Sequence, residues 1–324
     1  MSERILITGA DGFVGRALAR ALLPRLGPQD RLYGGQRRPD GTLQQGVEAN
    51  AIDVTDAVGT REAIRRLQPT CVVHLAAIAA IQEASQDKDL TWAVNFGGTR
   101  ILAEAILEDA PAARVVFVST SEVYGGTFKT CRGGVDESAP LDPANPYAAS
   151  KAAADLLIGQ MVREGLRAVR FRPFNHTGPG QTERFVVPAF AAQIARIEAG
   201  LQDPVIHVGN LDAVRDFLDI RDVVEAYIRA ILRPGLPDGV VLNLASGAPR
   251  RIGDILADLT ARAARPIEIA LDPARLRPSD TPVAFGNADR AANLLAWCPQ
   301  IPWTRTLDDV LDDWRHRVLH ERVS

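Results

Sequence analysis

The stretch Arg4-Ile-Leu-Ile-Thr-Gly-Ala-Asp-Gly-Phe-Val-Gly15 gives the first indication of the fold. Its first five residues are mostly apolar, which predicts a short buried strand over 4–8. After the glycines, the apolar pattern of residues 16–23 predicts a helix. The order of strand, glycine-rich turn and helix is typical of the first unit of a dinucleotide-binding fold.

The three glycines of this turn have separate uses. Gly9 permits a tight turn, Gly12 lets the backbone approach a pyrophosphate, and Gly15 permits close packing of the helix against the strand. The helix N-terminus adds free N–H groups and the positive end of its dipole, and both suit phosphate. We therefore predict a cofactor-binding turn that also includes Phe13 and Val14. The alternative is a plain structural turn.

The end of the second predicted strand, over 31–35, indicates which cofactor to expect. Turns that bind NAD usually have an Asp or Glu about 20 residues after the glycines, for the ribose hydroxyls. Here the strand is followed by Arg37 and Arg38 instead of a carboxylate. Guanidinium groups suit a 2′-phosphate, so the sequence favours NADPH over NADH. A solvated basic turn is the alternative.

Strands and helices alternate through the first half of the chain. Further strands are expected at 47–52, 71–75 and 115–118, with helices at 56–67 and 90–107. This alternation predicts an α/β fold with a Rossmann-type doubly wound parallel sheet. In such sheets, ligands bind beyond the carboxyl ends of the strands.

Residues at these strand ends are candidates for the cofactor site. Asp53 could accept a hydrogen bond from the adenine amino group, or it could cap the following helix. Ala76 and Ala77 are small enough for a cofactor to lie against the backbone. His74, inside an apolar strand, is interpreted as a core residue. The remaining cofactor-binding candidates in this part of the chain are Val54, Leu75 and Asn95.

The fifth strand is followed by Ser119-Thr-Ser-Glu-Val-Tyr-Gly125, which brings hydroxyls and a carboxylate to the same edge. Thr120 could donate a hydrogen bond to a substrate oxygen, and Glu122 could move a proton. Capping of the strand end is the alternative. The stretch 125–146 is rich in Gly, Pro and Asp, and it predicts a long surface loop that could cover the site.

Tyr147 and Lys151 stand four residues apart. Asn145 suits an N-cap and Pro146 suits the first helical position, so we predict a helix that presents both side chains on one face. An ammonium beside a phenol favours the phenolate, and we expect it to lower the pKa of Tyr147 from its ordinary value near ~10. A phenol tuned in this way is a usable acid or base. The alternative is a surface Tyr and a surface Lys at chance spacing.

The alternation becomes less regular after a sixth predicted strand at 168–171. We therefore expect an NADP-binding domain over 1–171 and a smaller C-terminal substrate-binding cap over 172–324, with some elements returning to the sheet. Within the cap, Arg215 and Arg277 lie in loop or strand-edge sequence. Two guanidiniums that converge there would hold a diphosphate, and two surface salt bridges are the alternative.

Composition excludes several classes of function. The 324 residues carry a net charge of -3, without the basic surplus of nucleic-acid-binding proteins. No apolar run approaches the ~20 residues that span a bilayer. The three cysteines are widely spaced and indicate neither a disulfide framework nor a metal site. We expect a cytoplasmic protein with no nucleic-acid or membrane partner.

In combination, the glycine turn of 9–15, Thr120 and the pair Tyr147-x-x-x-Lys151 resemble the extended short-chain dehydrogenase/reductases. The resemblance covers nearly the whole chain. Within that family, three later stretches are similar to enzymes that act on GDP-4-keto-6-deoxy-D-mannose. These stretches are 174–181, 208–217 and 276–280.

The resemblance implies NADPH-dependent reduction of the C4 ketone of GDP-4-dehydro-6-deoxy-D-mannose to GDP-6-deoxy-D-mannose (GDP-D-rhamnose). Tyr147 would donate the proton, Lys151 would hold the nicotinamide ribose, and Thr120 would bind the sugar O4. The residues that would hold the nucleotide-sugar are Asn175, Arg215 and Arg277. Family members often form homodimers through two helices each, which here would be 90–107 and 147–164.

Three alternatives stay open. GDP-mannose 4,6-dehydratase uses the same Tyr and Lys with a Thr-Ser-Glu segment, which residues 120–122 retain. Another nucleotide-sugar epimerase or reductase is the second alternative. A non-catalytic NADP-binding sensor or scaffold is the third, although it would be expected to lose the Tyr or the Lys. The sequence does not determine the base of the nucleotide or the stereochemistry at C4.

Overall fold

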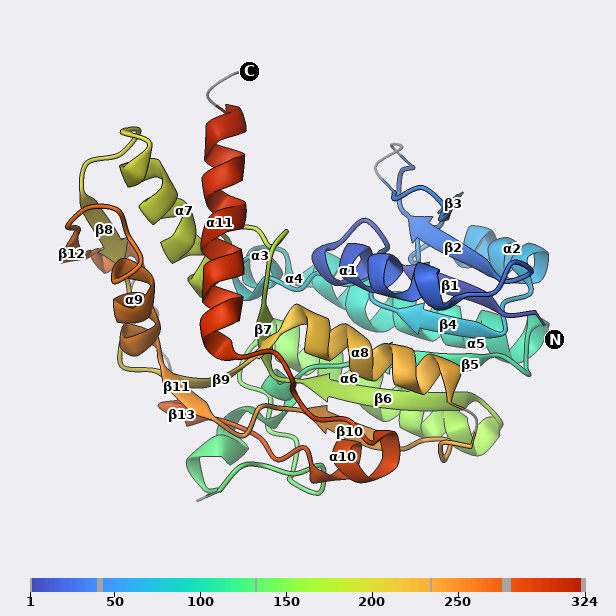
Figure 1. Ribbon diagram of the computed structural model, residues 1–324. Coiled ribbons are helices and arrows are strands. Elements are labelled where there is room, and N and C mark those ends of the chain that lie inside the picture. The colour runs from blue at the N-terminus through green and yellow to red at the C-terminus, as the bar shows by residue number, and fades with distance from the viewer. Residues whose placement is uncertain (1, 40–42, 132, 234, 276–280, 322–324) are drawn as a thin grey trace.

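The computed structural model describes residues 2–39, 43–131, 133–233, 235–275 and 281–321. Seven parallel strands form its central sheet (Figure 1). In spatial order the strands are β10 (Val241–Leu244), β6 (Arg167–Pro173), β5 (Arg114–Val118), β4 (Cys71–His74), β1 (Arg4–Thr8), β2 (Arg31–Gln36) and β3 (Glu48–Ala51). The chain proceeds outward from β1 in one direction to β3 and in the other to β10. This order confirms the predicted doubly wound sheet, whose ligand sites lie beyond the carboxyl ends of the strands.

The connection from β1 to helix α1 (Phe13–Leu22) is the glycine turn. Gly9 has a φ of +67°, which glycine adopts without strain, and a Cβ there would lie 2.9 Å from the backbone nitrogen of Ala76. A Cβ at Gly15 would lie 2.4 Å from the carbonyl oxygen of Gly9, so only glycine permits this packing of helix on turn. Extended Gly12 is the N-cap, and α1 therefore begins before the predicted start at residue 16.

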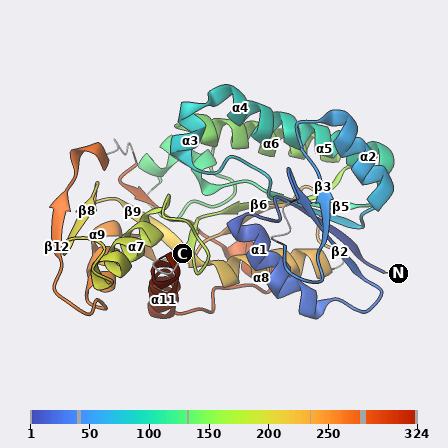
Figure 2. The same ribbon diagram turned by 90° about the horizontal axis from the view of Figure 1, so that it is seen from above.

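Helices cover both faces of the sheet (Figure 2). The helices on one face are α1, α8 (Ile220–Leu232) and α10 (Asp289–Leu295). Those on the other face are α2 (Ala57–Leu67), α5 (Thr99–Asp109) and α6 (Pro146–Met161). Each face buries its own cluster of apolar side chains, and each large aliphatic side chain contributes roughly 1.5–3 kcal/mol when fully buried.

The helical segment between β4 and β5 differs from the single regular helix predicted over 90–107. Two short helices lead into a π-helical turn, and the three elements before α5 are α3 (Ile81–Gln86), α4 (Lys88–Trp92) and η2 (Ala93–Gly98). Asn95 in the π turn is 1% exposed. Its side-chain oxygen accepts from the N–H of Ile78 (2.8 Å), and its amide nitrogen donates to Oγ of Ser150 (3.1 Å). The π turn therefore ties the loop after β4 to helix α6.

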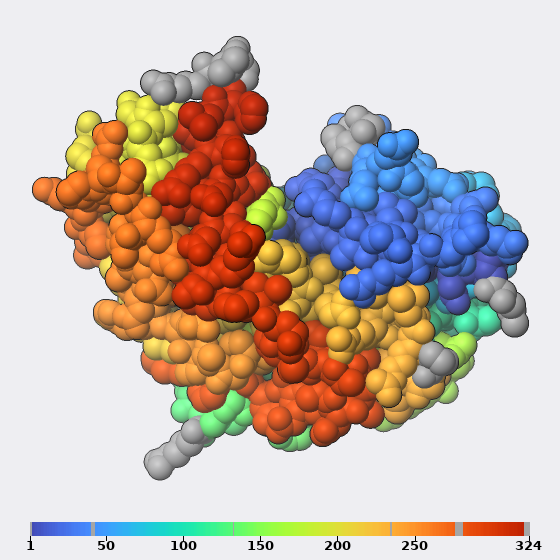
Figure 3. Space-filling model, in the orientation of Figure 1, coloured from blue at the N-terminus to red at the C-terminus, as the bar shows by residue number. Residues whose placement is uncertain are grey.

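A second lobe lies beyond the carboxyl ends of the strands, and Figure 3 shows a notch between its helix α11 and the N-terminal part of the sheet. Its strands are β7 (Asn175–Thr177), β9 (Val214–Asp219), β11 (Pro249–Arg251) and β13 (Val283–Ala284) in one sheet, and β8 (Val205–Val208) with β12 (Glu268–Leu271) in another. Its helices are α7 (Val186–Glu198), α9 (Ile252–Thr260) and α11 (Trp303–Glu321). Short 3₁₀ segments elsewhere are η1 (Leu23–Arg25), η3 (Ser121–Lys129), η4 (Val162–Glu164) and η5 (Pro273–Arg275).

Elements from the C-terminal half return to the central sheet, as the alternation of the sequence led us to expect. β10 pairs with β6 in parallel, and α8 packs against α1 on the same face of the sheet. Strand β6 itself continues to Pro173. The domain division between residues 171 and 172 stays a prediction.

Most of the stretch 125–146 lies at the surface, as predicted, but its start belongs to the 3₁₀ segment η3 and Val135 in its centre is buried. Val135 is 1% exposed, its N–H donates to the carbonyl of Phe285 (3.1 Å), and its carbonyl accepts from the N–H of Asn287 (2.9 Å). The high content of Gly and Pro predicted exposure, but at Gly134 the small residues instead permit close contact with the backbone of Gly286.

None of the helices within the described ranges has both the length and the apolarity that a membrane crossing requires.

Candidate active site

A row of buried polar side chains underlies the carboxyl edge of β1 and β4. Thr99 Oγ1 donates to the carbonyl of Asn95 (2.7 Å), so it must accept from Nε2 of His74 (3.0 Å). Nδ1 of His74 then accepts from the hydroxyl of Thr8 (2.8 Å), which itself accepts from the N–H of Ala76 (3.3 Å). Burial lowers the pKa of His74 to about 3, so the ring stays neutral. The interpretation of His74 as a core residue is confirmed.

The glycine turn offers donors that fit a pyrophosphate. The first backbone hydrogen bond of α1 runs from the N–H of Arg16 to the carbonyl of Gly12 (2.9 Å). The N–H groups of Phe13, Val14 and Gly15 precede it and therefore have no partner within the helix. The segment 75–77 lies half-buried beside the turn, with Ala76 in contact with Gly9. These groups suit a dinucleotide.

Arg37 and Arg38 are exposed directly after β2, where a 2′-phosphate would require them. Asp53 follows β3, and its Oδ1 accepts from both the hydroxyl (2.6 Å) and the N–H (2.9 Å) of Thr55. These bonds lower the pKa of Asp53, and the charge of Arg37 lowers it further. The N-cap of α2 is Asp56, which excludes the capping alternative for Asp53. Val54 beside it is buried.

Tyr147 and Lys151 lie on the first turns of α6, as predicted. The Oδ1 atom of Asn145 accepts from the N–H of Ala148 (2.9 Å), which confirms the predicted N-cap. Tyr147 is half-buried, and the hydroxyl of Thr120, which is 7% exposed at the end of β5, lies near enough to lower the pKa of its phenol. The structure therefore brings the two predicted hydroxyl groups together.

The ammonium of Lys151 is buried, with 3% of the residue exposed, and lies 4.5 Å from the ring centroid of Phe117. Among the residues that the structure describes, it makes no hydrogen bond and no ion pair. Burial lowers the pKa of Lys151 to about 8, although the charge of Asp155 opposes this. The ammonium is thus available to a bound molecule.

The predicted lowering of the pKa of Tyr147 is wrong for this structure. Burial raises the pKa of the phenol to about 12, and the charge of Glu122 adds to this rise. The neighbouring hydroxyl of Thr120 lowers the pKa but is the smaller effect. The sequence could place Lys151 one turn away, but it could not show that burial would dominate the pKa of the phenol.

Glu122 lies near the same hydroxyls. Burial raises the pKa of its carboxyl, which the charge of Arg215 and a hydrogen bond from Asn145 oppose. Arg215 on β9 therefore lies on the side of the second lobe that faces Glu122. Asn175 opens β7, which pairs with β9 and so lies beside it. The predicted partner Arg277 lies outside the described residues.

Residues 5–245, which include the glycine turn, Thr120, Tyr147 and Lys151, match the enzyme family described as NAD dependent epimerase/dehydratase. The chain belongs to this family. Its members are enzymes that use a nicotinamide cofactor on nucleotide-sugars, and the predicted membership of the extended short-chain dehydrogenase/reductases is confirmed.

Two epimerase/dehydratase relatives match almost the entire chain. GDP-6-deoxy-D-mannose reductase of Pseudomonas aeruginosa is 34% identical over 322 residues, which cover 99% of this chain and 100% of that protein. UDP-glucose 4-epimerase of Streptomyces lividans is 28% identical over 332 residues, which cover 99% and 98%. Among solved structures, RMD from P. aeruginosa complexed with NADPH is 30% identical with a TM-score of 0.82, over 98% of this chain and 100% of that one.

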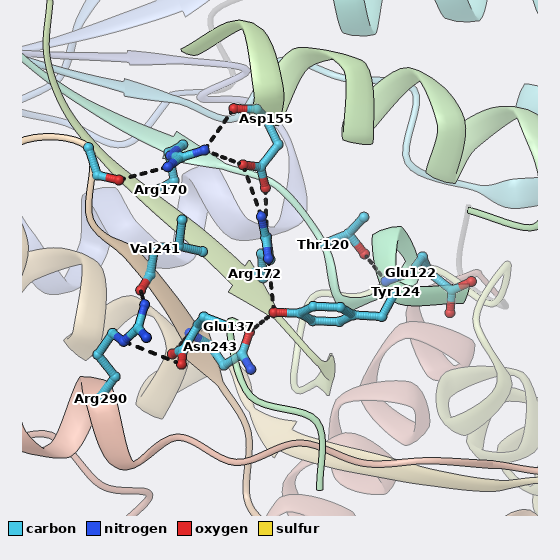
Figure 4. Close-up of polar contacts among 11 residues, drawn as sticks. Thr120, Glu122, Tyr124, Glu137, Asp155, Arg170, Arg172, Val241, Asn243 and Arg290 are labelled. Atoms are coloured by element: carbon cyan, nitrogen blue, oxygen red, sulfur yellow. Dashed lines mark hydrogen bonds and ion pairs between the residues drawn. The ribbon is translucent and has the colours of Figure 1, made fainter. Parts of the chain in front are cut away.

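Sequence reasoning missed one group of residues in this epimerase/dehydratase. Asp155, Arg170 and Arg172 form a buried ionic cluster behind the hydroxyls and connect to Tyr124, as Figure 4 shows. A signal was present, because two arginines alternate along the apolar strand β6. Buried arginines need a carboxylate partner, but the sequence does not indicate which of its many acidic residues supplies it.

Proposed function

We propose that this protein reduces the C4 ketone of GDP-4-dehydro-6-deoxy-D-mannose with NADPH and forms GDP-6-deoxy-D-mannose (GDP-D-rhamnose). The main support for the proposal is that Thr120, Tyr147 and Lys151 lie close together at the carboxyl edge of the sheet. The chain that holds them is similar to a GDP-6-deoxy-D-mannose reductase over its whole length. The P. aeruginosa structure with NADPH supports the choice of cofactor.

Tyr147 is the proton donor in this proposal. NADPH, when bound, supplies the hydride for C4, and the carbonyl oxygen then needs a proton. Because burial holds the pKa of Tyr147 near 12, the phenol is protonated at neutral pH, which is the form that a reductase requires. The hydroxyl of Thr120, which lies near Tyr147, would hold the sugar O4 beside it and stabilise the forming alkoxide.

Lys151 acts from the next turn of the same helix. Its ammonium, without a hydrogen-bonding partner among the described residues, would bind the hydroxyls of the nicotinamide ribose. Its positive charge would also favour the phenolate that Tyr147 becomes after the proton has moved. Recovery of the proton from solvent then restores the enzyme.

The remaining cofactor contacts come from the strand ends. The N–H groups of 13–15 would hold the pyrophosphate, with Gly9, Gly12 and Gly15 leaving room for it. Arg37 and Arg38 would bind the 2′-phosphate, and Asp53 with Val54 would lie at the adenine. The segment Leu75, Ala76 and Ala77 would contact the rest of the cofactor. Asn95, buried and bonded to Ile78, would act by holding that segment in place.

The second lobe would hold the nucleotide-sugar. Arg215, near Glu122, and Asn175, which lies opposite Phe217 on the strand that pairs with β9, support this assignment. Arg277 completes the proposed set, with the arginines at the diphosphate. We also propose the division into a cofactor domain over 1–171 and a substrate domain over 172–324.

A homodimer through α5 and α6 is part of the proposal. A groove between these helices includes Leu107, Leu157 and Met161 in its lining, and Leu156 on α6 is 61% exposed. Apolar side chains at a helix pair are suited to pairing with a second copy of the same two helices. We expect the location to be cytoplasmic, since all three cysteines carry free thiols.

GDP-mannose 4,6-dehydratase is the second candidate, because the carboxyl of Glu122 has a raised pKa and lies near Tyr147. Such a carboxyl could remove and return protons during elimination of water. Under this alternative, the protein would convert GDP-mannose without net consumption of NADPH.

The test is to incubate the protein with GDP-mannose and a catalytic amount of NADP⁺, and separately with its 4-keto-6-deoxy derivative and NADPH, following NADPH absorbance and analysing the sugar product. We expect stoichiometric loss of NADPH and formation of the 6-deoxy sugar with the keto derivative alone. Conversion of GDP-mannose with unchanged NADPH would replace the proposal with the dehydratase. Binding of NADPH with no turnover of either compound would indicate a sensor.

A further inference from the structure

Arg172 joins three elements that surround the candidate active site (Figure 4). Its Nε donates to Oδ2 of Asp155 (2.8 Å), and its Nη2 donates to Oδ1 of the same carboxylate (3.3 Å). Its Nη1 donates to the hydroxyl oxygen of Tyr124 (3.1 Å). Arg172 is on strand β6, Asp155 on helix α6 and Tyr124 in the 3₁₀ segment η3. One guanidinium therefore bridges all three.

This cluster is deeply buried. Asp155 and Tyr124 are fully buried, and Arg172 is 5% exposed. Burial alone would lower the pKa of Arg172, but the bonds to Asp155 and its charge outweigh this, so the pKa lies above the ordinary value. Arg170 also pairs with Asp155 (2.9 Å), and a Cβ at Gly159 would lie 2.5 Å from Arg170 Nη1. A mid-helix glycine thus makes room for the second arginine, although glycine weakens a helix.

A buried ionic cluster of this kind adds little to stability, because the loss of hydration of its charges offsets most of their attraction. Its conformational effect is larger, since each planar guanidinium accepts only a narrow range of partner positions.

Tyr124 is fixed from its other side as well. Its hydroxyl donates to Oδ1 of Asn243 on β10 (2.7 Å), whose own N–H donates to Glu137 (2.7 Å). Glu137 in turn pairs with Arg290 at 3.6 Å. The hydroxyl of Tyr124 thus accepts one hydrogen bond and donates another, which leaves the ring no freedom to move independently of β6 and β10.

The two segments held by Arg172 carry the proposed catalytic groups. Thr120 is the residue immediately before η3, and Tyr124 follows it by four positions. On α6, Tyr147, Lys151 and Asp155 occur at intervals of four residues, so they lie along one face of the helix. The two segments approach each other where the hydroxyl of Thr120 lies near the phenol of Tyr147.

We propose that Arg172 is a positioning residue for the reduction, which acts through Asp155 and Tyr124 to set the geometry between Thr120 and Tyr147. The inference rests on the proposed function. Arg172 itself does not reach the reacting atoms, because its guanidinium is occupied by Asp155 and Tyr124. Its loss should therefore slow the chemical step and leave the affinity for NADPH unchanged.

Tyr124→Phe tests the inference with the smallest change, since it removes a single oxygen atom. Because small misplacements of reacting groups are costly, we expect kcat to fall by about tenfold or more. KM for the 4-keto nucleotide-sugar and Kd for NADPH should stay within about twofold, since Tyr124 is fully buried and presents no surface to either ligand. Amide hydrogen exchange should become faster in 119–129 and also in 146–155, although the substitution lies in only one of these segments.

Arg172→Lys keeps the positive charge but cannot hold Asp155 and Tyr124 together in one plane. We expect a larger loss of kcat than in Tyr124→Phe, and the double variant should be no slower than Arg172→Lys alone. Arg315→Lys is the matched control, because Arg315 holds Glu198 with two nitrogens (2.8 and 2.9 Å) on helices α11 and α7 of the second lobe. It should lower Tm without changing kcat.

The inference is overturned if Tyr124→Phe and Arg172→Lys lower Tm yet keep kcat within about twofold of the wild type, as expected of Arg315→Lys. If Arg172→Lys does not fold, Tyr124→Phe decides on its own. If the wild type fails to oxidise NADPH with the 4-keto nucleotide-sugar, the proposed function fails first. Hydrogen exchange then decides the inference: faster exchange in 146–155 of Tyr124→Phe supports it, and unchanged exchange refutes it.

Discussion

Replacing Lys151 with Met should make the protein more stable at neutral pH while it abolishes reduction. Burial lowers the pKa of this ammonium from 10.5 to about 8. At about 1.4 kcal/mol per pH unit, the folded state bears a cost of roughly 3 kcal/mol for keeping Lys151 charged. Met fills a similar volume without the charge, so the free energy of unfolding should rise by up to about that amount.

The effect should depend on pH with a definite sign. Below pH 8, Lys151 is protonated in both the folded and the unfolded chain, and the full cost is present. Between pH 8 and 10.5, the folded protein loses its proton first, so the unfolded chain binds more protons and wild-type stability rises with pH. The advantage of Lys151→Met should therefore be largest below pH 8 and should disappear near pH 10.5.

Urea unfolding at several pH values measures this difference, with NADPH oxidation as the activity assay. Lys88→Met is the matched control, because Lys88 is exposed and its replacement should change stability by less than about 0.5 kcal/mol. A Lys151→Met variant that is no more stable than the wild type at neutral pH would refute the reasoning. So would a gain in stability that stays constant as the pH is raised.

Three further predictions concern the cofactor, the proton and the helix cap. Tyr147→Phe should keep the far-UV circular dichroism spectrum and lower kcat by about 10²- to 10⁴-fold, and near-normal kcat would exclude the proton-donor role. Replacing both Arg37 and Arg38 with Ala should weaken NADPH binding by about tenfold or more in fluorescence titrations and leave the affinity for NADH unchanged. An equal loss of affinity for NADPH and NADH would exclude contact with the 2′-phosphate. Asp56→Ala should lower the free energy of unfolding by about 1 kcal/mol, because its carboxylate caps α2. In urea unfolding, Asp53→Ala should cost less than Asp56→Ala, and the reverse order would contradict the assignment of the cap.

Local features of the site could be predicted because they depend on neighbours in the sequence. The glycine turn, the N-cap at Asn145 and the shared face of Tyr147 and Lys151 all follow from residues within one or two turns of each other. The parallel character of the sheet also follows from the alternation of strands and helices, since parallel strands must be joined by crossovers.

Features that depend on contacts between distant segments could not be predicted. The pKa of Tyr147 rises because several segments bury it, and no spacing rule reports burial. Asp155 is one acidic residue among many until β6 places Arg170 and Arg172 against it. Val135 lies in a Gly- and Pro-rich stretch that predicts exposure, yet it is buried by residues about 150 positions further along the chain.

The return of the C-terminal half to the central sheet has a consequence for engineering. Exchanging the second lobe between relatives would be a simple way to transfer substrate preference. It cannot be done by joining two sequences at a single position. A fragment that stops near residue 171 would lack β10 and α8, and it would leave the apolar surface of α1 and β6 open to solvent. A chimaera must instead be spliced at each crossing between the lobes, so that α8, β10 and α10 stay with the cofactor half while the strands between them are replaced.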